Sequence, residues 1–129
     1  MAYQYYQPNP RNKAVGDCVI RALCKAMSDD WYSVYTQVTV QGYAQADMPS
    51  SNAVWGQFLK ENGYQRYVIP NTCPDCYTIR EFADDNPVGT FIVCTGSHVV
   101  TIINGNYFDS WDSGNEVPIF YYRKEEQYA

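Results

Sequence analysis

The sequence predicts a single α+β domain spanning residues 1–129, with helices first and a mostly antiparallel sheet last. Residues 17–61 carry apolar positions at helical spacing with capping residues ahead of them. Residues 90–122 carry short β-branched runs joined by a hairpin turn. The chain has 129 residues and is 46% hydrophobic, which is enough for one domain with its own core.

Capping signals justify the helices in turn. Residues 1–16 contain two prolines and are expected to form an extended arm. Asp17 and Ser51 each precede an apolar segment, and Thr78 forms a capping box with Glu81. The second helix starts at Ser28-Asp29-Asp30 and is expected to fade near Gly42. The expected helices cover residues 19–27, 31–42, 52–61 and a short segment that ends before Pro87.

Runs of β-branched and aromatic residues between turn signals predict the strands. Asn104-Gly105 is a strong hairpin signal and joins two of these strands as an antiparallel pair. The charged residues 123–129 are expected to form a frayed tail. The expected strands cover residues 64–69, 90–95, 98–103, 106–111 and 117–122.

Composition disfavours several classes of protein. The net charge is −5 and no basic stripe is present, so no nucleic-acid partner is expected. No apolar run approaches the ~20 residues of a membrane span, and the first residues lack the apolar segment of a signal peptide. Five cysteines without a secretory signal are expected to be thiols, which predicts a cytoplasmic protein.

Cys18 is the candidate nucleophile. It follows Gly16-Asp17 at the expected first turn of a helix, where partial positive charge and free N–H groups favour the thiolate. A small cysteine buried in an apolar helix is the alternative interpretation. The neighbouring Asp17 carboxylate opposes thiolate formation.

His98 is the one histidine of the chain, and therefore the one candidate base for cysteine chemistry. A third group should orient its ring. If the hairpin turn has two residues, Ile103 pairs with Asn106, and Asp109 lies on the same face as His98 within diagonal reach. A three-residue turn would favour Asp112 instead, because a one-residue slip reverses every side chain.

Three segments resemble the papain-like cysteine peptidase superfamily, and they occur in that family's order. They are Gly16-Asp17-Cys18-Val-Ile-Arg-Ala-Leu, Gly96-Ser97-His98-Val-Val and Asp109-Ser110-Trp111. The third is similar to the family's Asn-Ser-Trp, with aspartate in place of asparagine. The resemblance is to a compact bacterial or phage-type member.

The resemblance implies a papain-like fold and a thiol hydrolase that acts on a peptide or protein substrate. Cys18, His98 and Asp109 would form its triad, and Trp111 would shield the histidine–aspartate contact from water. The family has an oxyanion-hole glutamine six residues before the nucleophile, and Asn12 stands at that position here. No cofactor and no metal are implied.

The substrate groove is expected to include Trp111, Tyr107, Gly96 and Ser97. Aromatic residues of the N-terminal arm, such as Tyr5, would add to the walls of this groove. Gln7 is a second candidate for the oxyanion donor if the arm folds back over the cleft.

Two other functions remain open. A papain-like shell without turnover would be a binding module. Cys73-x-x-Cys76 suggests a redox or zinc protein, but structural zinc needs four ligands, so one pair is a weak signal. The simpler interpretation of this pair is a surface loop with two thiols or a local disulfide.

Overall fold

The structure is a computed structural model, and it describes residues 2–70 and 74–125. The helices in this part of the chain are α1 (Cys18–Met27), α2 (Trp31–Gln45), α3 (Asn52–Glu61) and α4 (Ile79–Asp85). The strands are β1 (Tyr3–Tyr5), β2 (Tyr64–Val68), β3 (Thr90–Cys94), β4 (Val99–Ile103), β5 (Asn106–Asp109) and β6 (Phe120–Lys124).

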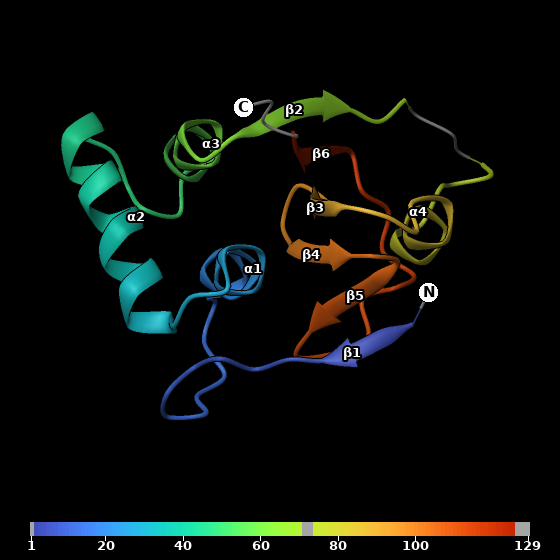
Figure 1. Cartoon of the computed structure of the whole chain (residues 1–129), viewed down its shortest axis with the longest axis horizontal. Coiled ribbons are helices and arrows are strands. Elements are labelled where there is room, and N and C mark those ends of the chain that lie inside the picture. The colour runs from blue at the N-terminus through green and yellow to red at the C-terminus, as the bar shows by residue number, and fades with distance from the viewer. Residues whose placement is uncertain (1, 71–73, 126–129) are drawn as a thin grey trace.

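The predicted α+β class is confirmed. The strands form one mixed six-stranded sheet in the order β1-β5-β4-β3-β6-β2 (Figure 1). Neighbouring strands are antiparallel except β1 and β5, which run parallel. Within residues 2–70 and 74–125, none of the helices has the length and apolar character that crossing a bilayer requires.

The predicted caps of α3 and α4 are confirmed. The Ser51 side chain accepts a hydrogen bond from the Ala53 N–H, and Thr78 and Glu81 form a reciprocal capping box. The predicted end of α2 near Gly42 is wrong, because the helix continues to Gln45. Gly42 is buried, and a Cβ there would lie 2.7 Å from the Asp47 carbonyl oxygen of the following loop. This close approach explains a glycine inside a helix.

The two ends of the described chain are more ordered than predicted. Residues 3–5 of the expected arm form β1, which pairs with the end of β5 at the edge of the sheet. The last strand starts at Phe120 rather than 117 and reaches Lys124, which pairs with Tyr64 of β2. Residues 123 and 124 are therefore part of the sheet, and the Glu125 N–H donates to the Gly63 carbonyl. The rest of the predicted frayed tail lies outside the described residues.

The core lies on both faces of the sheet. Side chains of β3 alternate, so that Ile92 and Cys94 pack with α1, α2 and α3, while Phe91 and Val93 pack with α4. The Thr101 hydroxyl of β4 donates a 2.6 Å hydrogen bond to the Ala22 carbonyl of α1. This contact joins the middle of α1 to the middle of β4, and Figure 1 shows α1 beside the end of the sheet where β4 starts and β5 ends.

Candidate active site

The turn between β4 and β5 sets the geometry of the site. Ile103 pairs with Asn106, so the predicted two-residue turn and its register are confirmed. Asn104 and Gly105 have φ values of 49° and 80°, as a type I′ hairpin turn requires. This register selects Asp109 over Asp112 as the neighbour of His98.

Asp109 binds His98 directly. The His98 Nε2 atom lies 2.6 Å from Oδ2 of Asp109, a carboxylate that is fully buried. Because Nε2 is engaged in this way, Nδ1 is the ring nitrogen left for Cys18, whose thiol interacts with His98. The alternative, Asp112, is exposed and instead accepts hydrogen bonds from the Tyr107 hydroxyl and the Gly114 N–H.

Cys18 is the first residue of α1 and is half-buried. Burial opposes its ionisation, but hydrogen bonds with His98 and the Val99 N–H, together with the charges of His98 and Arg21, lower the pKa of the thiol. Burial also opposes the charge on His98, yet its hydrogen bonds to Asp109 and Cys18 raise its pKa to about 9. Both shifts favour a thiolate–imidazolium pair at neutral pH.

Asp17 occupies the N-cap position of α1, but the prediction that its side chain caps the helix is wrong. It makes no side-chain cap hydrogen bond. Its buried carboxylate instead accepts hydrogen bonds from Arg21 Nη1 at 3.0 Å and from Trp31 Nε1 at 2.9 Å. The first-turn N–H groups of α1, including that of Cys18, therefore lack a side-chain cap and suit a bound anion.

Arg21 is the site residue that sequence reasoning missed. Its side chain is only 6% exposed, and its Nη2 lies 3.1 Å from Oδ1 of Asp109. The signal was a charged residue within the apolar run Val19-Ile20-Arg21-Ala22-Leu23, since arginine is rarely buried unless paired.

The Asp109 carboxylate is surrounded by donors. Oδ2 accepts from His98 and from the Ser113 hydroxyl at 2.7 Å, while Oδ1 accepts from Arg21 and from the Ser110 N–H at 2.7 Å. Burial acts to raise its pKa, but the hydrogen bonds from His98 and Ser113 and the charges of His98 and Arg21 lower it. Asp109 is therefore held ionised and in one orientation.

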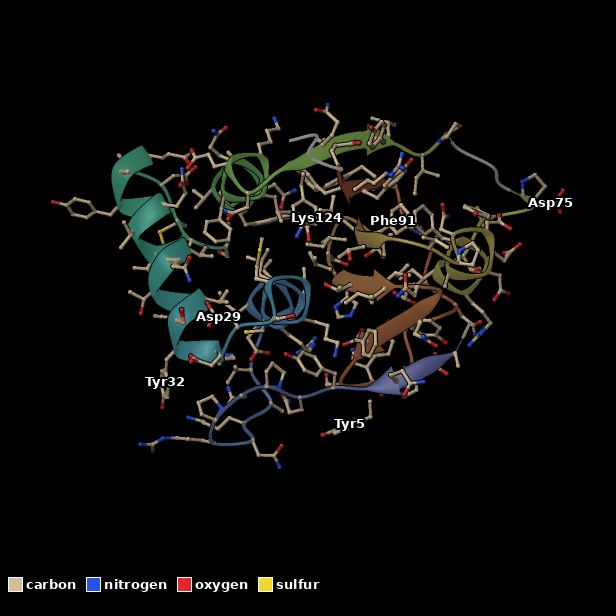
Figure 2. The ribbon with its side chains drawn as sticks, in the orientation of Figure 1. Tyr5, Asp29, Tyr32, Asp75, Phe91 and Lys124 are labelled. Carbon is tan, nitrogen blue, oxygen red and sulfur yellow. The ribbon has the colours of Figure 1, made fainter. Side chains whose placement is uncertain are left out.

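A cavity of about 610 Å³, the active-site cavity, opens onto Cys18 and His98. The Trp111 ring, which is 46% exposed, lies 5.0 Å from the His98 ring between centroids and covers one side of it. Ser97 and Tyr5 also line the cavity, and Tyr5 extends from the edge strand β1 (Figure 2).

Two predicted groove residues lie elsewhere. Tyr107 is only 1% exposed and packs into the core beside α4, where its hydroxyl donates to Asp112. It lies two residues before Asp109 along β5, so it is too far from the end of the sheet to line the active-site cavity. Gly96 is not among the described lining residues, and its φ of 101° shows that it serves the turn between β3 and β4.

Both candidate oxyanion donors line the active-site cavity. Asn12 is exposed and adopts a left-handed conformation with φ of 52°. Gln7 is half-buried, and its Oε1 accepts a hydrogen bond from the Asn9 N–H at 3.2 Å. Because this contact fixes the amide and leaves its NH₂ group as a donor, the geometry favours Gln7 over Asn12.

A second cavity of about 330 Å³, the side cavity, adjoins the first and shares Val15 and Gly16 with it. Its walls are largely apolar and come from the start of α1, the start of α2 and the loop before α3. They include Val19, Ile20, Trp31, Tyr35 and Pro49.

The Cys73-x-x-Cys76 motif cannot be assigned to a site, because residue 73 lies outside the described residues. In the described part of the chain, no group of three or more histidine, cysteine, aspartate and glutamate side chains is placed to hold a metal ion.

Comparisons with protein-family models, curated proteins and solved structures returned no match for this chain.

Proposed function

We propose that the chain is a thiol-dependent hydrolase, a cysteine peptidase or amidase with a compact papain-like fold. The observation that supports this most directly is the 2.6 Å hydrogen bond between Asp109 and His98, whose ring also interacts with the Cys18 thiol at the start of a helix. Nucleophile, base and orienting group are arranged as thioester chemistry requires. An open cavity lies in front of them.

In the proposed acylation step, the Cys18 thiolate attacks the substrate carbonyl carbon and forms a C–S bond. The oxyanion is held by the Cys18 N–H and by an amide of the arm, Gln7 or Asn12. The C–N bond then breaks, and the His98 imidazolium gives its Nδ1 proton to the leaving amine. The products are a thioester and a neutral imidazole.

In the proposed deacylation step, His98 accepts a proton from water, and the hydroxide formed attacks the thioester carbonyl carbon. The C–S bond breaks, the acid is released, and the thiolate–imidazolium pair returns. Asp109 stays ionised throughout and holds the ring in place.

Selective alkylation tests this proposal. We expect iodoacetamide to modify Cys18 at pH 6 on the order of 100-fold faster in the native protein than in His98→Gln, because the ion pair maintains the thiolate where an ordinary thiol is protonated. The modified residue is identified by mass spectrometry. The buried thiols Cys24 and Cys94, whose pKa values burial raises, serve as internal references.

The pH dependence of peptide hydrolysis is a second test of the proposal. Peptide hydrolysis should rise as Cys18 ionises below its ordinary range and fall as His98 loses its proton near pH 9. If Cys18 reacted only above pH 8, and equally in His98→Gln, the site would be an inert shell and the binding-module alternative would stand.

The side cavity supports a more specific expectation about the substrate. We expect it to take a large apolar side chain near the scissile bond, since it is apolar and adjoins the active-site cavity at Gly16. Gly16→Leu should remove a preference for such residues in an internally quenched peptide library while iodoacetamide still modifies Cys18. A Cβ at Gly16 meets no atom within 4 Å, so Gly16→Ala is the matched control. An unchanged preference in Gly16→Leu would exclude this role.

A further inference from the structure

Arg21 joins the two elements that carry the reactive pair. It lies on α1 three residues after Cys18, and its guanidinium contacts Asp17 at 3.0 Å and Asp109 at 3.1 Å. All three side chains of this bridge are at most 6% exposed. The bridge therefore connects the start of the nucleophile helix to the hairpin that carries His98.

These contacts continue through the reactive pair itself. From Asp17 the series runs through Arg21, Asp109 and His98 to Cys18, which is the residue next to Asp17. A displacement of one side chain in this series should therefore shift the others, because buried polar networks have few alternative arrangements. The planar guanidinium suits this role, since it presents separate N–H groups to two carboxylates.

The charges point to the same role. With the thiolate–imidazolium pair formed, the network holds three negative groups, Asp17, Asp109 and Cys18, and two positive groups, Arg21 and His98. Without Arg21, the imidazolium would be the one positive group left among these members of the network. Like charges disfavour the ionisation of a neighbouring acidic group, so the loss of Arg21 should disfavour the Cys18 thiolate most.

We propose that Arg21 is a positioning residue for the thiol chemistry, a role that rests on the proposed function: its guanidinium joins α1 to the Asp109 carboxylate and so keeps His98 against an ionised Cys18. Arg21 is not itself the base or the nucleophile. It acts through Asp109, and it also holds the Asp17 carboxylate in a contact of its own.

The test measures the rate of Cys18 alkylation by iodoacetamide against pH in the full chain. In Arg21→Gln we expect the midpoint of thiolate formation to rise by about one pH unit or more. Lys25→Gln is the matched control, since Lys25 lies one turn further along α1, over the Tyr6 and Phe108 rings and outside the bridge. Its midpoint should equal that of the native protein.

A double variant separates the bridge to Asp109 from simple neutralisation of Asp17. Asp17→Asn/Arg21→Gln removes one negative and one positive charge. Because no buried Asp17 carboxylate is then left without its cation, this variant should lose less folding stability than Arg21→Gln alone. We expect its midpoint to stay raised, because Asp109 still lacks its contact with the Arg21 guanidinium. A midpoint restored to the native value would overturn the proposal.

Arg21→Lys retains a buried cation and is decisive if neither neutral variant folds, as judged by thermal melting. An ammonium lacks the guanidinium fork, so the midpoint should rise, though less than in Arg21→Gln. An unshifted midpoint in this variant would also overturn the bridging role. Failure of the proposed function is distinct, since the native protein itself would then show no enhanced Cys18 reactivity.

Discussion

Cys18→Ala is expected to reduce peptide hydrolysis on the order of 10⁴-fold or more, because no thioester can form without the thiolate. An internally quenched peptide library provides the substrate, and mass spectrometry identifies the cleaved bonds. The fold should be unaffected, since Cys18 is half-buried at the start of α1 and its side chain is small. Thermal melting checks this point.

Cys24→Ala is the matched control for the loss of a thiol from the same helix. Cys24 is only 1% exposed, and burial, with the charges of Asp29 and Asp30, raises its pKa to about 12. Activity per folded molecule should therefore be retained. Hydrolysis that survived in Cys18→Ala would remove the thiol mechanism. If Cys18→Ala and Cys24→Ala both bound peptide and neither cleaved it, the chain would be a binding module.

Asp109→Asn is expected to have the second largest effect. All four partners of the carboxylate, which are His98, Ser113, Arg21 and the Ser110 N–H, are donors. An amide has one accepting end, so its NH₂ group must face a donor in either orientation. Arg21 would also keep only Asp17 as a counter-charge. We expect the free energy of unfolding to fall by about 3–5 kcal/mol, as for the loss of one partner from a buried ion pair.

The same substitution should lower the pKa of His98 from about 9 towards its ordinary value of 6.5. The charge of Asp109 would be lost, while burial, which disfavours the imidazolium, would remain. Cys18 would then lose its charged partner at neutral pH, and alkylation at pH 6 should slow. Because the chain has one histidine, its ring signals in an NMR titration are unambiguous.

Asp112→Asn is the control for this experiment. Asp112 is exposed, lies three residues further along the chain and contacts Tyr107 and Arg80 rather than His98. It should leave both the His98 titration and the alkylation rate unchanged. If His98 still titrated near pH 9 in Asp109→Asn, the carboxylate would not be the source of its raised pKa.

Local interactions explain what could be predicted from the sequence. Caps such as Ser51 and Thr78 act within one helical turn, and the Asn104-Gly105 turn sets its hairpin register with few alternatives. That register in turn places Asp109 beside His98. The proximity of these two residues was therefore predictable, although they are eleven positions apart.

Contacts between distant segments could not be predicted in the same way. The pairing of residues 3–5 with β5 joins two segments that lie far apart in the sequence, and so short a strand has no periodic signal. Tyr107 and the exposed Tyr5 are both aromatic, and their burial depends on where along the sheet each lies. Composition alone does not distinguish a core tyrosine from one that lines a cavity.

The sequence itself determined the order of Cys18, His98 and Asp109 along the chain. It also determined the helix that follows Cys18 and the hairpin between His98 and Asp109. Only the tertiary structure decided that the start of α1 meets the end of that hairpin, and that Arg21 lies between them. The physical reason is that a buried ion pair forms only when packing removes both partners from water. The bridge between Arg21 and Asp109 therefore exists only after α1 has packed on the sheet.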